Sequence, residues 1–219
     1  MKIDFKRKAG IRPVVFIDVD GVCVKWQSGL PYYLSQKNID SSKALEMMLS
    51  EEFLSPEQLI GMDYNISSLF IRDYNKSDFI KYLAPYDDAL KMINEMKHHW
   101  DFVALTALGT ETETLMNRAF NLNALFPGAF KDIFACGIGA KKDEIISKAA
   151  EKYNDRVVMF IDDVAMNIDS SAKVIPSIPR YHIVRGSRNK PKSECFTFKN
   201  LSEVKSHYLS MVFENEKAA

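Results

Sequence analysis

Cysteine is scarce in this sequence, and the few cysteines lie far apart. Cys23, Cys136 and Cys195 form no C-x-x-C spacing, so they offer no cysteine-based zinc site, and an odd, scattered set gives no disulfide framework. Such cysteines are typical of reduced thiols. We therefore expect a cytoplasmic protein.

Long apolar runs and an excess of one charge are also missing. No run approaches the roughly 20 residues that a membrane-spanning helix needs, so we expect no membrane partner. The 29 Lys and Arg residues balance the 29 Asp and Glu residues, so no overall field would recruit nucleic acid or anionic lipid. With 47% hydrophobic and 26% charged residues, the composition is typical of a soluble globular enzyme.

The most informative stretch runs from Val14 to Val22. Its apolar, mostly β-branched start predicts a strand that is buried on both faces, as in a parallel sheet. Asp18 and Asp20 follow directly, and Gly21 marks a turn at the carboxyl end of the strand, where open α/β sheets place their ligands. An ordinary strand followed by an Asp-Gly turn would have the same sequence pattern, so this stretch alone does not distinguish a ligand site from a simple turn.

Residues 25–83 show helical signals and no second buried strand. Apolar residues recur between Ser41 and Leu49, and Ser55 to Gln58 read as a capping box with proline at the first helical position. This segment predicts a helical insertion of the size of a small satellite domain.

After residue 84 the pattern alternates between strands and helices. The predicted strands are 102–106, 132–137 and 157–161, with short candidates at 182–184 and 195–198. Helices are expected from about 85, from a capping box at Thr110, from Lys142 and from Leu201; the second of these carries Leu115, Met116, Ala119 and Leu122 on its apolar side. This alternation predicts a doubly wound, mainly parallel α/β sheet.

The predicted strand ends carry a coherent set of polar side chains. Several carboxylates in one cleft would repel one another unless a divalent cation and a lysine neutralised them, and oxygen-only ligands favour Mg²⁺. That cation would hold and polarise a phosphoryl group. The set consists of Asp18, Asp20, Thr106, a lysine at 141 or 142, Asp162 and Asp163.

Four motifs, in this order, resemble those of the haloacid dehalogenase (HAD) superfamily. They are F-I-D-V-D-G-V, L-T-A, K-K-D-E-I-I and F-I-D-D. The resemblance implies a Rossmann-like core made of residues 1–24 and 84–219, with a small helical cap, residues 25–83, inserted after the first strand.

The resemblance also implies roles for the motif residues. Asp18 matches the nucleophile that forms an aspartyl-phosphate, and Asp20 the general acid and base. Thr106, with Ala107 beside it, matches the phosphate-binding site. Lys142 fits the catalytic lysine best, and Lys141 stays open as a residue that contacts substrate. The implied Mg²⁺ ligands are Asp162, Asp163, the Asp18 carboxylate and the Asp20 backbone carbonyl.

In that superfamily, an aspartate two residues after the nucleophile is the phosphatase pattern. Asp20 therefore indicates a Mg²⁺-dependent phosphomonoester hydrolase. The insertion lies between the first and second motifs, which resembles the position of helical C1-type caps, and such caps close over the substrate and exclude water.

Aromatic residues near the start of the insertion suggest the substrate. Trp26, Tyr32 and Tyr33 could stack on a base, and the superfamily's 5′(3′)-deoxyribonucleotidases place an aromatic residue at a similar spacing. Packing of Trp26 between insertion and core explains the same residues equally well. We expect a nucleotide or another small phosphorylated metabolite as substrate.

Two alternatives remain open. The basic stretch 185–192 could bind a nucleic-acid phosphate, which would make the protein a polynucleotide-end phosphatase, although charges in a loop are more often solvated. A catalytically silent binding module is the other alternative, and the intact set of reactive residues argues against it. The sequence predicts no particular oligomeric state.

Overall fold

The computed structural model describes residues 11–52 and 54–218 of the chain. The first ten residues of the predicted core segment 1–24 lie outside this part. Within the described residues, no helix is both long enough and apolar enough to cross a membrane.

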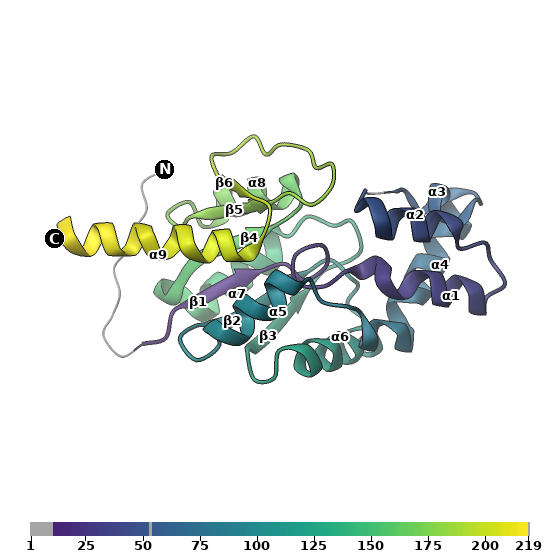
Figure 1. Cartoon of the computed structure of the whole chain (residues 1–219), viewed down its shortest axis with the longest axis horizontal. Helices are drawn as coiled ribbons and strands as arrows, with labels where there is room; N and C mark the ends of the chain where they lie inside the picture. The colour runs from purple at the N-terminus through teal and green to yellow at the C-terminus, as the bar shows by residue number, and fades with distance from the viewer. Residues whose placement is uncertain (1–10, 53, 219) are drawn as a thin grey trace.

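Parallel strands form one six-stranded sheet in the order β3-β2-β1-β4-β5-β6 (Figure 1). The central strand β1 is fully buried, as its continuous apolar run requires. Ile17 of β1 pairs with Ala104 of β2 and Ile161 of β4, so these strands end side by side. The predicted doubly wound α/β fold is confirmed. The strands are β1 (Val14–Ile17), β2 (Asp101–Thr106), β3 (Phe130–Ala135), β4 (Val157–Asp162), β5 (Arg180–Ile183) and β6 (Phe196–Phe198).

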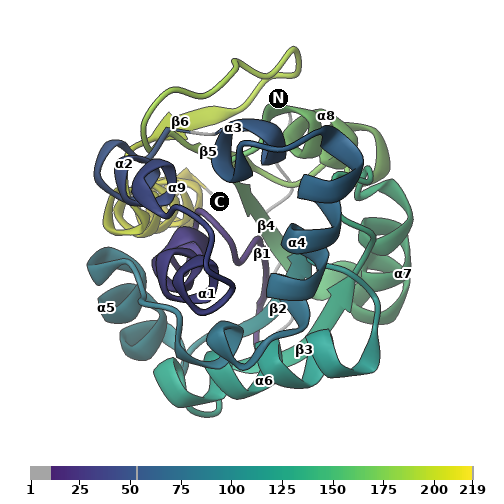
Figure 2. The same ribbon diagram turned by 90° about the vertical axis from the view of Figure 1, so that its right-hand side faces the viewer.

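Helices cover both faces of the sheet. Alternate residues of a strand point to opposite faces, so Val15 and Ile17 pack in a cluster with α5 and α9, whereas Val14 and Phe16 pack with α7 and α8. Figure 2 shows the same division of these helices between the two sides of the sheet. The core helices are α5 (Asp87–Met96), α6 (Thr112–Leu125), α7 (Asp143–Tyr153), α8 (Ala165–Val174) and α9 (Leu201–Ala218).

The segment between β1 and α5 is a run of helices that lies beyond the carboxyl ends of the strands (Figure 1). Its two ends are joined: Val24 and Pro85 form an antiparallel bridge, and the Lys25 N–H donates to the Ala84 carbonyl at 2.8 Å. The chain therefore enters and leaves the segment at one place. The elements are η1 (Trp26–Gly29), α1 (Leu30–Gln36), α2 (Ser42–Ser50), α3 (Pro56–Ile60), α4 (Tyr64–Lys76) and η2 (Asp78–Tyr82).

One of the two predicted capping boxes forms. Ser55 and Gln58 exchange the two expected hydrogen bonds at the start of α3. The box predicted at Thr110 is wrong, because α6 begins at Thr112 and no side chain caps it. The carboxylate of Glu111 lies instead 3.3 Å from Lys76 of α4.

Two core helices differ from the sequence-based expectation because their buried faces are polar. Met116 of α6 is 67% exposed, although it was expected on the apolar side. Helix α8 was not predicted at all, since polar residues occupy buried positions and interrupt any apolar periodicity. The buried polar residues are Thr114, Asn117, Arg118 and Asn121 in α6, and Asn167, Ser170 and Ser171 in α8.

Candidate active site

Asp18 follows β1 directly and is held at the carboxyl edge of the sheet. Its N–H donates to the Ile161 carbonyl of β4 at 2.9 Å, which continues the strand pairing by one residue. Its Oδ1 accepts a hydrogen bond from the Val19 N–H at 2.7 Å. The residue is only 6% exposed. The end of β1 thus presents a buried and oriented carboxylate.

Lys142, the residue before α7, reaches this carboxylate. Its Nζ lies 2.8 Å from Asp18 Oδ1 and 2.8 Å from Asp162 Oδ2. Burial lowers the pKa of Lys142, but the two carboxylates outweigh that effect and raise the pKa above its ordinary value. The neighbouring Lys141 is exposed. Of the two candidate lysines, the structure brings Lys142 to the carboxylates.

Three buried carboxylates meet here. Oxygens of Asp18, Asp162 and Asp163 lie within 4.8 Å of one another. Asp162 is fixed by Asn167 Nδ2 at 3.0 Å and by the Val164 N–H at 2.9 Å. The sheet therefore brings together the ends of β1 and β4, as the sequence predicted.

The charge of this cluster fits a divalent cation. Burial raises the pKa of Asp18 well above its ordinary value, and Lys142 offsets this only in part. Burial, followed by the negative charge of Asp162, raises the pKa of Asp163 to about 6. Buried carboxylates of this kind need a positive charge, and an all-oxygen donor set suits a hard ion such as Mg²⁺.

Gly21 allows the loop after β1 to pack on this cluster. Its φ of +80° lies in the left-handed region. A Cβ atom at this position would lie 2.4 Å from Asp163 Oδ2. The glycine predicted as a turn residue is therefore required both by backbone conformation and by the close approach of Asp163.

The Asp20 side chain points to a different set of partners. Its Oδ2 accepts from the Thr106 hydroxyl at the end of β2, at 3.4 Å, and its Oδ1 lies 2.5 Å from Arg118 Nη2. Asp20 is thus brought next to Thr106, as predicted, but its carboxylate is not among the three that cluster.

Arg118 was missed by the sequence analysis. The apolar pattern of α6 gave no role to this residue, yet the side chain is fully buried. A signal existed: Thr114, Asn117, Arg118 and Asn121 are spaced by three, four and seven residues, which places them on one helix face.

Two further predicted substrate residues lie close to the site in sequence. Trp26, at the start of η1, donates from Nε1 to Asn75 Oδ1 at 2.8 Å, and its ring packs edge-on against Tyr74 with 5.1 Å between centroids. Asn75 also donates to the Leu108 carbonyl at 3.0 Å, so this group connects the insertion to the loop after β2. Ala107, in that loop, is half-buried.

The basic stretch 185–192 is partly turned inward. Arg185 pairs with Asp88 at 2.8 Å and stacks on Tyr86, and Arg188 pairs with Asp163 at 3.0 Å. Lys190 and Lys192 are exposed.

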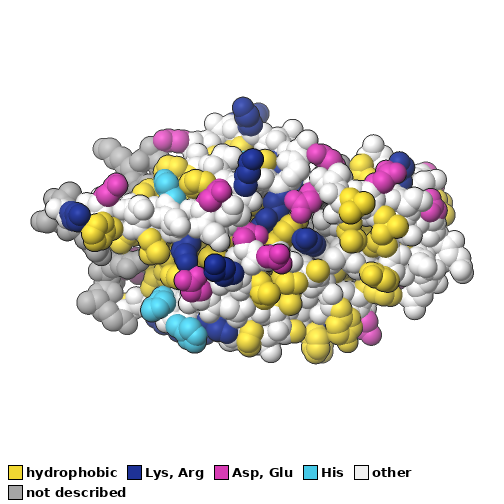
Figure 3. All heavy atoms as spheres, viewed as in Figure 1, with side chains coloured by type: hydrophobic (Ala, Val, Ile, Leu, Met, Phe, Trp, Pro, Cys, Tyr) yellow, Lys and Arg dark blue, Asp and Glu magenta, His cyan; other side chains and the backbone are white. Residues whose placement is uncertain are grey.

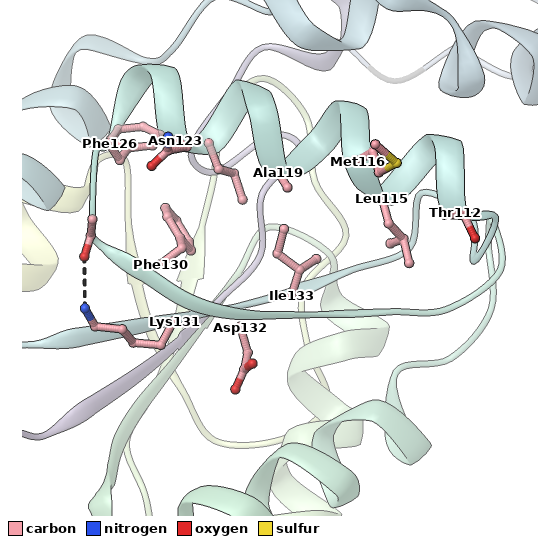
Figure 4. Close-up of a pocket in the computed structure, with 12 residues that line it drawn as sticks. Thr112, Leu115, Met116, Ala119, Asn123, Phe126, Phe130, Lys131, Asp132 and Ile133 are labelled. Atoms are coloured by element: carbon pink, nitrogen blue, oxygen red, sulfur yellow. Dashed lines mark hydrogen bonds between the residues drawn. The ribbon is translucent and has the colours of Figure 1, made fainter.

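A separate groove of about 530 Å³ lies between α6 and β3 (Figure 4). It is lined by Leu115, Met116 and Ala119, the side of α6 that was expected to face the core, together with Phe130 and Ile133 of β3. None of the clustered carboxylates lines it. The groove is therefore not part of the candidate active site.

A relative by sequence comes from a bacteriophage. No known family model matches the chain. An uncharacterized 32.4 kDa protein from the Gp30-rIII intergenic region of Enterobacteria phage T4 is 45% identical over 184 residues. The match covers 84% of this chain and 65% of the phage protein, so the chain spans less than two thirds of that relative.

Solved structures share the fold at low sequence identity. A haloacid dehalogenase-like hydrolase from Streptococcus pneumoniae superposes with a TM-score of 0.62 at 16% identity, over 90% of this chain and 98% of that one. A predicted phosphatase from Clostridium acetobutylicum gives 0.62 at 18% identity, over 92% and 100%. A HAD hydrolase from Bacillus subtilis bound to magnesium gives 0.60 at 15% identity, over 90% and 98%. The chain therefore has the fold of the HAD-like hydrolases.

Proposed function

We propose that this protein is a Mg²⁺-dependent phosphomonoester hydrolase that acts through an aspartyl-phosphate intermediate. The observation that carries the proposal is the contact of the buried Lys142 ammonium group with both Asp18 and Asp162 at 2.8 Å. A fixed positive charge beside a buried carboxylate reduces its repulsion from an anionic phosphate, which a nucleophilic carboxylate requires. The HAD-like fold supports the same chemistry.

In the first step, a carboxylate oxygen of Asp18 bonds to phosphorus while the bond from phosphorus to the leaving oxygen breaks. Asp20 donates a proton to that leaving oxygen. The Thr106 hydroxyl, together with backbone near Ala107, binds the non-bridging oxygens, and Lys142 balances the charge that gathers on them.

In the second step, Asp20 takes a proton from a water molecule, and the water oxygen attacks phosphorus. The bond between phosphorus and the Asp18 oxygen breaks, which restores the carboxylate and releases inorganic phosphate. The same Asp20 side chain therefore acts first as acid and then as base.

Magnesium would be held by the carboxylates of Asp18, Asp162 and Asp163 together with the Asp20 backbone carbonyl. When bound, the ion orients the phosphoryl group and offsets negative charge. The proposal is supported by the three buried carboxylates and by the magnesium in the Bacillus subtilis structure.

We assign residues 25–83 as a C1-type cap on a core of residues 1–24 and 84–219. Two observations support this. The segment lies beyond the carboxyl ends of the strands, and its ends meet at the Val24 and Pro85 bridge, which suits a hinge. Most of the proposed reacting groups are buried, which suits a site that excludes water.

The substrate that we propose is a nucleotide or another small phosphorylated metabolite. Trp26 stands at the start of the proposed cap, partly exposed, and its hydrogen bond to Asn75 fixes the orientation of the ring. An oriented aromatic face can stack on a base. The three cysteines are unpaired, which suits the reducing cytoplasm in which such metabolites occur.

A polynucleotide-end phosphatase is the less favoured alternative. Arg185 and Arg188 both have acidic partners, which leaves fewer charges of the 185–192 stretch for a nucleic acid. Basic and acidic side chains also alternate on the face shown in Figure 3, without a field of one sign. A catalytically silent binding module would not need the Asp18, Lys142 and Asp162 arrangement.

The decisive experiment is a phosphatase screen with nucleotides, sugar phosphates and a 3′-phosphorylated oligonucleotide, each with Mg²⁺ and with excess chelator. We expect release of phosphate that needs Mg²⁺ and is abolished by Asp18→Asn, because an amide is a poor nucleophile. Lys142→Met should also abolish it, and Lys141→Met, at the exposed neighbouring lysine, is the matched control and should keep most activity. Full activity in chelator, or in Asp18→Asn, would overturn the proposal.

A further inference from the structure

Helix α6 buries an arginine that the proposed reaction steps do not yet use. Arg118 is fully buried and is among the largest fully buried side chains of the described residues. Burying a guanidinium group costs desolvation free energy unless partners compensate it. Its partners therefore indicate why the charge is kept.

Arg118 makes few contacts, and its one short contact is with Asp20. Nη2 donates to Asp20 Oδ1 at 2.5 Å, Nη1 has a long contact of 3.5 Å to Asn121 Oδ1, and Nε has no partner among the described residues. Arg180 of β5, also buried, differs: it donates to the backbone carbonyls of Pro176, Ile178 and Glu194. These three contacts of Arg180 are with backbone, whereas the short contact of Arg118 is with a carboxylate.

This contact makes the two oxygens of Asp20 unequal. Oδ1 is anchored by the guanidinium group, and Oδ2 has only the 3.4 Å contact with the Thr106 hydroxyl. A protonated carboxyl can still accept from Arg118 through its carbonyl oxygen while its other oxygen carries the proton. Oδ2 is therefore the oxygen that can hold and transfer a proton in both steps.

The same face of α6 also holds the end of the insertion. Asn117 Nδ2 donates to the carbonyls of Lys76 and Ser77, at 2.8 and 3.0 Å. Asn121 Nδ2 donates to the carbonyls of Lys81 and Leu83, at 3.2 and 3.1 Å. The segment 76–83 and Asp20 are thus attached to neighbouring residues of one helix.

We propose that Arg118 is a positioning residue that fixes Asp20 with Oδ2 directed at the leaving oxygen, and that Asn121 links this position to segment 76–83. The inference rests on the proposed function, since it assumes that Asp20 transfers the proton. Beyond the proposed function, it gives Arg118 a role, identifies Oδ2 as the oxygen of Asp20 that transfers the proton, and connects Asp20 to the insertion.

The test compares two leaving groups. A p-nitrophenolate leaving group hardly needs protonation, whereas an alkoxide needs it. A misplaced Asp20 should therefore slow the hydrolysis of an alkyl phosphate more than that of p-nitrophenyl phosphate. We expect Arg118→Met to lower kcat/KM for an alkyl phosphate at least about tenfold more than for p-nitrophenyl phosphate. Arg118→Lys, which keeps the charge and most of the volume, should recover part of this difference and covers the case in which the methionine variant does not fold.

Arg180→Met is the matched control for loss of a buried arginine. It should lower Tm but reduce kcat/KM for both substrates by the same factor. If wild-type protein hydrolyses neither phosphate, the proposed function fails. If wild-type protein hydrolyses both, and the Arg118 variants lose the same factor with each, the function stands and the positioning role is wrong.

Asn121→Ala tests the connection to the insertion. It removes the contacts with Lys81 and Leu83 and leaves the Arg118 contact with Asp20 in place. We expect a smaller loss that is again greater for the alkyl phosphate, and a double variant with Arg118→Met that is no worse than Arg118→Met alone. Additive losses in the double variant would show that Asn121 does not act through Arg118.

Discussion

Arg188 donates from Nε to Oδ2 of Asp163 at 3.0 Å, and the two side chains are 8% and 1% exposed. The same guanidinium group donates from Nη1 to the Glu51 carbonyl in the insertion at 3.1 Å. Beside it, the Ser187 N–H donates to Glu52 Oε1 at 3.0 Å. Arg188 therefore joins one carboxylate of the acidic cluster to the turn after α2.

Replacing Arg188 by methionine should destabilise the protein by about 3 kcal/mol, because it leaves the Asp163 carboxylate buried without its partner. Thermal unfolding in chelator measures this loss. Added Mg²⁺ should raise the Tm of Arg188→Met more than that of wild type, since the cation supplies the missing positive charge. Lys190→Met is the matched control and should leave Tm unchanged; an equally stable Arg188→Met would show that the pair contributes nothing.

Gly21→Ala should lose activity because the new Cβ atom would collide with Asp163. Gly61→Ala is the control, since it has the same kind of backbone conformation without the collision. Gly21 and Gly61 have φ values of +80° and +75°, but a Cβ at 61 meets nothing within 4 Å, whereas at 21 it would lie 2.4 Å from Asp163 Oδ2. Both variants carry the conformational cost of about 1 kcal/mol. Only Gly21→Ala should also lower kcat, by more than about tenfold, and weaken the binding of Mg²⁺ in a titration. Equal kcat values in the two variants would contradict this close approach.

Without a divalent cation, stability should fall as pH rises from about 4 to about 6. Burial, followed by the charge of Asp162, raises the pKa of Asp163 from 3.8 to about 6. In this window the folded state keeps a proton that the unfolded state has lost, so stability present at pH 4 is lost as pH passes 6. The effect is at most about 3 kcal/mol, and Tm in chelator measures it.

Asp163→Asn distinguishes the pH dependence of stability that comes from Asp163 from that of other carboxylates, because the asparagine does not titrate. The difference in Tm between wild type and Asp163→Asn should therefore change between pH 4 and pH 6 and be nearly constant above pH 7. In saturating Mg²⁺ the decline should shrink, since the ion replaces the proton. A constant difference across the whole range would mean that Asp163 has an ordinary pKa.

The sequence was sufficient where one strand or one motif determines the outcome. The apolar, mostly β-branched run at 14–17 predicted a strand buried on both faces, and all four residues of β1 are buried. Asp18 directly follows β1 and Asp162 is the last residue of the neighbouring strand β4, so the parallel sheet alone brings them together. These features depend on local patterns and on the rule that strand ends share one edge.

The sequence was insufficient where a charge is buried by a distant partner. Arg118 and Asp20 are 98 residues apart, and Arg188 and Asp163 are 25 apart, so no periodicity links them. Lys141 and Lys142 are adjacent; the sequence favoured Lys142 but left Lys141 open, and the structure turns Lys142 inward. Helix α8 escaped prediction because its buried face carries Asn167 and Ser171 instead of apolar residues.

Trp26→Ala should raise KM for a nucleotide at least about tenfold more than for p-nitrophenyl phosphate, if its ring stacks on the base. Loss of one stacked base costs about 1–3 kcal/mol, and the aryl phosphate has no base to lose. Tyr64→Ala, which removes an exposed ring of the same segment, is the matched control and should change neither KM. Equal effects on both substrates would assign Trp26 to packing against Tyr74.

Asp20→Asn tests the mechanism, because Asp20 is proposed to act in both steps. In single-turnover experiments, formation of the aspartyl-phosphate should slow about a hundredfold or more for an alkyl phosphate and only mildly for p-nitrophenyl phosphate, since an asparagine cannot supply the proton that an alkoxide needs. Breakdown of the intermediate should slow equally for both substrates, because after the first step the intermediate is the same. An identical loss for both leaving groups in the first step would mean that Asp20 acts through loop geometry or the cation site, and the assignment of Asp20 as proton donor would then be wrong.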